Sequence, residues 1–283
     1  MTGSFLSEFV QPGDFDPFQC DLGLMGLMGK QLSSAEEKVR AEQWSSFSQH
    51  IQDLNDSSPA TTRYKLLYLA RHGQGIHNVA EATYGTAKWE SHYAKLDGAA
   101  GIGEWVDAPL TPEGIRQAKD ASNFWLKFSE RNITALPQSY YVSPLDRCLA
   151  TARFTFGPLQ LPKDRSYKPV VKEMLRETMG VHTCDKRRSR SYIEKTYPEV
   201  TIAEPFAEED TLWNAHRRET NQIMDFRFRG LLREIFKTDN NTHISLTAHS
   251  GAIASILRVL GHVPFRLKTG SVMAVFVKAE NVQ

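Results

Sequence analysis

The segment LLYLARHGQGIHN, residues 66–78, holds the clearest structural signal in the chain. It opens with largely apolar residues and runs directly into Arg71 and His72, which are followed by Gly73 and Gly75. A short apolar run bounded by glycines indicates a buried strand. A charged residue and a titratable residue at the end of such a strand predict a ligand or a reaction there, because a purely structural strand end needs neither.

Short apolar runs then alternate with helical patterns along the chain. The runs are KLLYLA, SYYVS, KPVVKE, HISLTAH and SVMAVFVKAE, and the helical patterns include TPEGIRQAKDASNFWLKFSERN, PLDRCLATARFTF and GAIASILRVLG. Thr111 suits a helix N-cap and Pro112 suits the first helical position, which predicts a helix start there. The alternation predicts an α/β fold, a three-layer sandwich with a mostly parallel sheet. Ligands of such sheets bind at the carboxyl ends of the strands.

Two parts of different character are expected. Residues 1–64 form an N-terminal extension that is packed on the domain or partly disordered, with one helix over about 34–54. Residues 65–283 form one domain with insertions at about 79–106 and 178–212. Loops of this length in a compact domain are usually functional or disordered.

Composition excludes several classes of protein. The 283 residues include 34 Lys and Arg against 33 Asp and Glu, so a net charge of +1 argues against nucleic acid or an anionic membrane as a partner. No apolar run approaches the length of a membrane span, and the N-terminus does not have the pattern of a signal peptide. The three cysteines are odd in number and widely spaced, which fits a reducing compartment, the cytosol or alternatively the nucleus.

Three strand ends carry matching side chains. The first provides Arg71, His72 and Asn78, YVSPLDR provides Arg147 just inside a helix, and SLTAHSG provides His249 directly before another helix. Because the carboxyl ends of parallel strands meet at one edge of a sheet, we expect these residues to converge.

Four segments carry a family resemblance. LARHGQGIHN, SPLDRCLATA, LRE and TAHSG, in this order and spacing, resemble the histidine phosphatase superfamily in its phosphoglycerate-mutase-like branch. RHGQGIHN and GVHTCDKR are most similar to the fungal phosphomutase-like proteins of that branch. The resemblance covers about residues 65–278. It implies a phosphoglycerate-mutase-like fold with inserted cap loops, and a metal-independent enzyme that acts on a small phosphorylated substrate without a cofactor.

The resemblance also implies roles for single residues. His72 would be the nucleophile that forms a phosphohistidine intermediate, with its ring held by a backbone carbonyl near Gly73. Arg71 and Arg147 would bind the phosphoryl oxygens, since guanidinium groups are planar, bidentate donors that stay charged at pH 7. Asn78 and His249 would complete the anion pocket, with His249 adding positive charge.

Glu177 matches the position of the general acid, which protonates the leaving alkoxide and then activates water. Glu173 and Asp185 lie close in sequence and remain alternatives. Ser250 stands where the acid phosphatase branch has an Asp after its histidine, so the acid should come from elsewhere, which is consistent with Glu177. Ser250 also begins a helix whose N-terminus would add phosphate-binding N–H groups.

Two features of the second insertion invite further interpretation. His182, Cys184 and Asp185 suggest a metal, but residues at this crowded spacing make a poor ligand set, and we expect no metal. A run of cations, Lys186, Arg187, Arg188 and Arg190, is either a solvated basic loop or a site for a second anionic group on the substrate. We expect the latter, because the loop follows the proposed acid.

Alternatives remain open at two levels. The first insertion has side chains that either line the substrate mouth or pack the insertion onto its domain: Trp89, His92, Tyr93, Lys95 and Trp105. The activity is expected to be phosphate ester hydrolysis, with a phosphomutase, or a module that serves mainly in partner binding or regulation, as the alternatives. Hydrolysis is favoured because the chain ends soon after its last apolar run, without an obvious long tail to close the site.

Overall fold

The structure, a computed structural model, describes residues 34–130, 135–161, 166–280 and 282. Its centre is a six-stranded sheet with the order β6-β5-β4-β7-β1-β8. These strands are β1 (Arg63–Arg71), β4 (Ser139–Val142), β5 (Pro169–Val171), β6 (Thr201–Ile202), β7 (His243–Ala248) and β8 (Val272–Ala279). Strand β8 runs antiparallel to β1, and the other neighbours in this sheet are parallel. The predicted mostly parallel sheet is confirmed.

Strand β1 lies inside the sheet and is buried on both faces. Leu66 and Tyr68 contribute to one hydrophobic cluster, whereas Leu67 and Leu69 contribute to another. Alternating side chains of a strand point to opposite faces, so a strand covered on both sides must be apolar at every position. This explains why the run is continuous rather than alternating.

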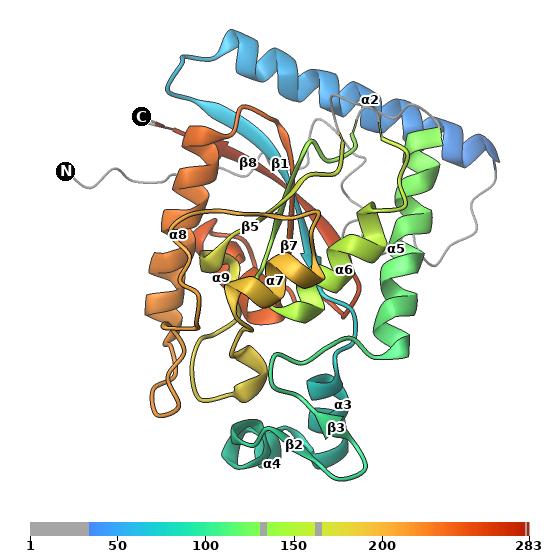
Figure 1. The fold of residues 1–283 in the computed structure, drawn as a ribbon. Helices are drawn as coiled ribbons and strands as arrows, with labels where there is room; N and C mark the ends of the chain where they lie inside the picture. The colour runs from blue at the N-terminus through green and yellow to red at the C-terminus, as the bar shows by residue number, and fades with distance from the viewer. Residues whose placement is uncertain (1–33, 131–134, 162–165, 281, 283) are drawn as a thin grey trace.

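Helices cover both faces of the sheet, as Figure 1 shows. Helices α2, α5 and α6 pack on one face, and α8 and α9 pack on the other. Their bounds are Ser34–Ser57 for α2, Pro112–Glu130 for α5, Asp146–Phe156 for α6, Asn221–Thr238 for α8 and Ser250–Val259 for α9. This arrangement confirms the three-layer α/β sandwich.

The N-terminal helix packs on the sheet. The helix expected over about 34–54 is found as α2, and its Phe47 and Ile51 are buried in the same cluster as Leu66 and Tyr68 of β1. Residues 1–33 of the predicted extension lie outside the described residues. None of the helices in the described part of the chain is long and apolar enough to cross a membrane.

The first insertion forms a small subdomain beyond the carboxyl edge of the sheet (Figure 1). It contains α3 (Ile76–Tyr84), α4 (Thr86–Ser91), the 3₁₀ turn η1 (Tyr93–Lys95) and the short strands β2 (Gly98–Ala99) and β3 (Gly103–Glu104). Trp89 and Trp105 are buried in its own hydrophobic cluster, with ring centroids 5.4 Å apart. These two tryptophans therefore pack the insertion rather than line a substrate mouth.

The second insertion is partly integrated into the domain. It contains the 3₁₀ turn η4 (Thr183–Asp185) and α7 (Arg190–Thr196), which are followed by β6. Strand β6 pairs in parallel with β5 and forms the edge of the main sheet. The segment 178–212 is thus not only an inserted cap loop, because its last part completes the sheet. The sequence TI is too short to be recognised as a strand.

The loop after β1 fits tightly against the start of α5. A Cβ atom added to Gly73 would collide with the carbonyl oxygen of Gly114, so only glycine allows the two segments to approach this closely. Thr111 Oγ1 accepts a hydrogen bond from the Gly114 N–H at 3.1 Å. The predicted N-cap is therefore confirmed, and it holds this contact in place.

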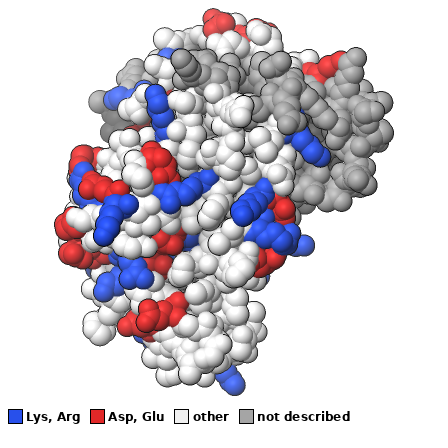
Figure 2. Space-filling view, turned by 45° about the vertical axis from the view of Figure 1, so that its right-hand side comes forward, with Lys and Arg blue, Asp and Glu red and all other residues white. Residues whose placement is uncertain are grey.

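Charges of both signs are mixed on the surface. Figure 2 shows Lys and Arg side chains lying among Asp and Glu on the face in view. On this face the basic residues form no single field, which agrees with the net charge of +1. Any preference for anions must come from a local site.

Candidate active site

Four of the predicted residues meet at the carboxyl edge of the sheet. Arg71 ends β1 and pairs in register with Ala248 of β7, so the following residues, His72 and His249, are neighbours. Their ring centroids are 5.2 Å apart. Arg147 enters from α6, which follows β4 on the other side of β7. Adjacent parallel strands therefore bring together residues from three distant parts of the chain.

His72 is held in one tautomer. Its Nδ1 lies 2.7 Å from the carbonyl oxygen of Gly73, and because a carbonyl only accepts, Nδ1 carries the proton. Burial, and next the charges of Arg147 and Arg71, hold the pKa of His72 well below its usual value. The imidazole is therefore neutral at pH 7, with its lone pair on Nε2.

His249 is also buried and bonded. Its Nε2 lies 2.7 Å from Ser143 Oγ and 3.4 Å from Cys148 Sγ. Burial, and next the charge of Arg147, holds the pKa of His249 well below its usual value. The expectation that His249 adds positive charge thus does not fit its surroundings: with these neighbours it is a neutral hydrogen-bonding group. Ser143 lies inside the SPLDR motif, but the sequence does not reveal that it contacts His249.

Both arginines of the site keep an unused buried donor. Arg147 donates from Nη1 to the Cys184 carbonyl at 2.6 Å and from Nη2 to Asp185 at 2.9 Å. Arg71 donates from Nη1 to the Leu267 carbonyl at 2.9 Å. The Nε atoms of Arg71 and Arg147 are buried and have no hydrogen-bond partner in the described structure. Since a buried unpaired donor is costly, these two atoms indicate a site for an anion.

Glu177 lies beside these arginines, at the N-terminus of α9. Its carboxylate accepts hydrogen bonds from the Gly251 N–H at 2.9 Å and from the Thr178 N–H at 2.8 Å. Burial lowers the pKa of Arg71 and the charge of Glu177 opposes this most strongly, so the two groups are close. A Cβ atom on Gly251 would collide with Glu177 Oε1. Only glycine leaves room for the carboxylate in this position.

The alternatives to Glu177 are occupied elsewhere. Glu173 is buried and pairs with Arg176 and Arg187, and Asp185 pairs with Arg147 and Arg218. Each of these two carboxylates is thus engaged and held in place by two guanidinium groups. The geometry therefore favours Glu177 among the three carboxylates.

Asn78 and Ser250 lie at helix starts near the site. The side-chain oxygen of Asn78 accepts from the Gly75 N–H at 2.9 Å and caps α3, which leaves its amide nitrogen as the group available to a phosphate. Ser250 is the first residue of α9 and is half-buried. Their binding roles stay predictions.

Arg187 of the basic loop does not have the role expected of it. Arg187 is buried, and its Nε donates to Glu173 at 2.9 Å. Its Nη atoms bond the carbonyl oxygens of Ala207, Arg188, Glu208 and Glu209. Every nitrogen of this guanidinium is therefore used, and Arg187 is a structural residue that has none left for a substrate.

The other three cations of the loop also have partners, although they are less buried than Arg187. Arg190 pairs with Glu194 and Glu204, Lys186 lies 5.2 Å from the Trp213 ring centroid, and Arg188 lies 5.6 Å from that of Tyr192. Lys186 and Arg188 are exposed. The sequence could not reveal Glu204 and Trp213 as partners, because both lie many residues beyond the loop.

His182, Cys184 and Asp185 do come together, with their potential ligand atoms within 4.8 Å of one another. The surroundings do not suit a cation, because Asp185 already faces the guanidinium groups of Arg147 and Arg218. Burial also raises the pKa of the Cys184 thiol well above its usual value, which disfavours the thiolate that metals bind. The cluster serves to hold Arg147.

Asp107 is a further residue that sequence reasoning missed. It has a φ of 45° and is buried, and its two oxygens accept from the N–H groups of Asp146 at 2.9 Å and Arg188 at 3.0 Å. It thus fastens the start of α6, which carries Arg147, to the second insertion. Burial raises its pKa to about 7. The only signal in the sequence is its place directly before APLTP.

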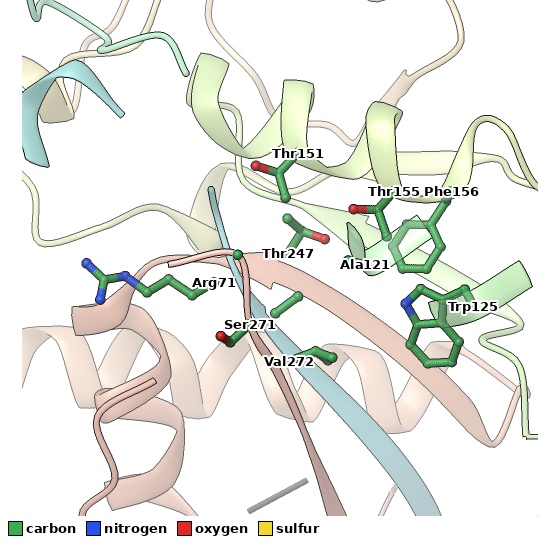
Figure 3. A pocket seen from close by; sticks show the side chains of 11 residues that line it. Arg71, Ala121, Trp125, Thr151, Thr155, Phe156, Thr247, Ser271 and Val272 are labelled. Atoms are coloured by element: carbon green, nitrogen blue, oxygen red, sulfur yellow. The ribbon is translucent and has the colours of Figure 1, made fainter. Parts of the chain in front are cut away.

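A small cavity lies behind the site, between the sheet and helices α5 and α6 (Figure 3). Its volume is about 20 Å³, which holds about one water molecule and not a phosphate ester. Arg71 contributes to its wall, but the guanidinium extends away from the hydroxyl groups of Thr151, Thr155 and Thr247. The cavity is therefore not the substrate site.

Comparisons with known proteins agree with this geometry. The model of the histidine phosphatase superfamily (branch 1) matches residues 67–270. A protein of Arthroderma benhamiae named "Probable phosphoglycerate mutase" is 46% identical over 280 residues, which cover 98% of this chain and 83% of the relative. A Saccharomyces cerevisiae protein named "Probable phosphoglycerate mutase PMU1" is 37% identical over 247 residues, which cover 80% of this chain and 83% of the relative.

Among solved structures, the crystal structure of a phosphoglycerate mutase from Thermus thermophilus aligns with a TM-score of 0.39 and 22% identity. The alignment covers 74% of this chain and 92% of that one. The family match spans most of the chain and includes every strand end that carries a site residue. The chain therefore belongs to the histidine phosphatase superfamily, branch 1.

Proposed function

We propose that the protein is a phosphomonoesterase that transfers the phosphoryl group of a phosphate ester first to His72 and then to water. The observation that carries the proposal is the pair of buried, unpartnered Nε atoms on Arg71, at the end of β1, and Arg147, at the start of α6, beside a neutral His72. Phosphoryl transfer needs such an arrangement, because it depends mainly on positioning and on charge complementary to the phosphoryl oxygens.

In the first step, the lone pair of His72 Nε2 forms a bond to phosphorus. The bond from phosphorus to the ester oxygen breaks, and its electron pair leaves with the alkoxide, which takes a proton from Glu177. In the second step, Glu177 accepts a proton from water as the water oxygen attacks phosphorus. The nitrogen–phosphorus bond then breaks, and its electron pair returns to Nε2.

The hydrogen bonds of Glu177 support the second step most directly. Two backbone N–H groups donate to its carboxylate and hold its oxygens beside the site, where one of them can accept a proton from water. In the first step Glu177 must be protonated, so we expect alkyl phosphates to depend on it more than activated aryl phosphates do. Replacing Glu177 by Gln should therefore slow alkyl esters by a larger factor than aryl esters, and equal slowing would exclude the acid role.

The experiment that tests the proposal is labelling of the intermediate. Wild-type protein quenched during turnover of a radiolabelled phosphate ester should carry a label that is stable to base and labile to acid. His72→Ala should carry none and lose turnover by roughly a thousandfold or more while remaining folded. His77→Ala should still take the label, although the His77 ring lies 5.4 Å from that of His72. Near-wild-type turnover by His72→Ala would disprove the mechanism.

A phosphomutase is the second candidate, because the relative that is 46% identical carries the name of a phosphoglycerate mutase. A mutase must protect the phosphohistidine from water, and His72 is only 2% exposed. Incubation with a phosphoglycerate separates the two activities. Release of inorganic phosphate supports hydrolysis, whereas conversion to the isomer with little release supports a mutase.

A further inference from the structure

The segment 261–271, which joins α9 to β8, lies against the phosphoryl site. The Arg71 N–H donates to the Ser271 carbonyl and the Gly270 N–H donates to the His72 carbonyl, both at 2.9 Å. The Arg71 guanidinium donates to the Leu267 carbonyl, also at 2.9 Å. The site residues themselves therefore determine where this segment lies, and no sequence motif singles it out.

Arg266 directly precedes Leu267 and brings a third arginine close to the site. Burial is the main cause of the lowered pKa of Arg71, and among neighbouring cations Arg266 lowers it more than Arg147 does. The charge of Arg266 therefore acts on Arg71. Arg266 is exposed, and no residue in the described ranges forms a hydrogen bond or an ion pair with it.

Among the charges that act on Arg71, the carboxylate of Glu177 has the largest effect and the guanidinium of Arg266 the next largest. Glu81 opposes the lowered pKa of Arg71, but less than Arg266 promotes it. Glu81 also accepts a hydrogen bond from Thr86 at 3.0 Å. By contrast, Arg187 and Arg190 of the basic loop are satisfied by carboxylates and carbonyl oxygens. Two cations that repel each other across solvent are stabilised by an anion that contacts both.

We propose that Arg266 forms a second anion site beside the phosphoryl site, so that the enzyme prefers phosphate esters that carry another phosphate or carboxylate group. This inference rests on the proposed function, which places the reacting phosphoryl group at Arg71 and Arg147. The second anionic group of the substrate accepts hydrogen bonds from the Arg266 guanidinium, which is planar and bidentate. The Arg266 site replaces the basic loop as the source of selectivity.

The test is a binding measurement that needs no turnover. Calorimetry at constant ionic strength gives the Kd of propylphosphonate and of 1,3-propanediphosphonate, which differ only in the second phosphonate. Wild-type protein should bind the diphosphonate about tenfold more tightly, a difference of about 1.4 kcal/mol. Arg266→Ser should reduce this preference to about twofold, and Arg266→Lys should keep part of it.

Two variants serve as matched controls. Lys268→Ser removes an exposed cation from the same segment, and Arg188→Ser removes one from the basic loop. Both should keep the preference of the wild-type protein. The proposal is overturned if wild-type protein shows no preference, if Arg266→Ser keeps it, or if Lys268→Ser loses as much. Absence of phosphate release would instead disprove the proposed function, because phosphonate binding is measured separately.

Discussion

Arg147 and Arg187 are both buried arginines within segments that carry the family resemblance, yet their surroundings differ. Arg147 is 1% exposed and keeps its Nε without a partner among the described residues. Arg187 is 4% exposed, and its Nε bonds Glu173 while both Nη atoms bond backbone carbonyls. Arg147 therefore keeps a donor for a ligand beside His72, whereas Arg187 has none left and holds the fold together.

The strongest test of this difference replaces each arginine by lysine, which keeps the charge but not the planar set of donors. Arg147→Lys should lower kcat/KM by roughly a hundredfold or more, since losing one preorganised donor to the transition state typically costs this much. Arg187→Lys should leave kcat/KM per folded molecule nearly unchanged. Steady-state kinetics corrected for the folded fraction provide the measurement. Equal losses of activity in the two variants would remove the distinction.

For the same two variants, we expect Arg187→Lys to lower the free energy of unfolding more than Arg147→Lys does. Arg187→Lys loses several hydrogen bonds to carboxylate and carbonyl oxygens in a buried place. Because a bond to a charged group contributes about 1.5–3 kcal/mol, its free energy of unfolding should fall by at least about 3 kcal/mol. Urea denaturation monitored by circular dichroism measures this. An unchanged midpoint for Arg187→Lys would mean that these contacts contribute little.

Gly251 and Gly230 differ in the space that each leaves for a side chain. A Cβ at Gly251 would collide with Glu177, whereas a Cβ at Gly230 in α8 would meet nothing within 4 Å. Gly251→Ala should displace Glu177 and lower kcat for alkyl phosphates by about tenfold or more, as expected when a proton-transfer group is misplaced. Gly230→Ala should leave kcat unchanged and stabilise the helix by about 0.5–1 kcal/mol. Shortening the carboxylate with Glu177→Asp in Gly251→Ala should restore part of the rate.

Asp107 differs from the carboxylates of Glu173 and Asp185, because it is buried and forms no ion pair among the residues that the structure describes. Its pKa of about 7 lies above the usual 3.8, so the folded state binds a proton that the unfolded state releases in this range. Stability should therefore fall as pH rises from about 4 to about 7. Asp107→Asn removes this cost, so its Tm should improve relative to wild type as the pH rises through about 7. A constant difference in Tm would show that Asp107 titrates normally.

The smallest effect is expected from chelation. His182, Cys184 and Asp185 lie close together, but two guanidinium groups already neutralise Asp185. Dialysis against EDTA should leave the rate of phosphate release unchanged. Loss of activity that zinc restores would mean that the cluster binds a metal and that the role assigned to Asp185, holding Arg147, is incomplete.

Much of the fold and of the site follows from local sequence. Continuous apolar runs indicate strands covered on both faces, and Thr111 with Pro112 indicates a helix start, because these signals act within one turn or one strand. The sequence does not indicate strand β6, because this strand has two residues and depends on pairing with β5. Arg187 was misinterpreted because its partners, such as Glu173 and Ala207, lie 14 and 20 residues away.

The positions of Arg71, His72 and His249 at strand ends, and of Arg147 at a helix start, follow from the amino-acid sequence alone, since hydrophobic patterning and motif spacing are properties of the chain. Which cations remain available to a ligand is instead a property of the folded molecule. The donors of Arg187 are bonded to carbonyl oxygens that are distant in the sequence. Arg266 lies near Arg71 because hydrogen bonds join the end of β1 to the segment before β8. Availability depends on which donors are satisfied, and donors are satisfied by neighbours in space rather than along the chain.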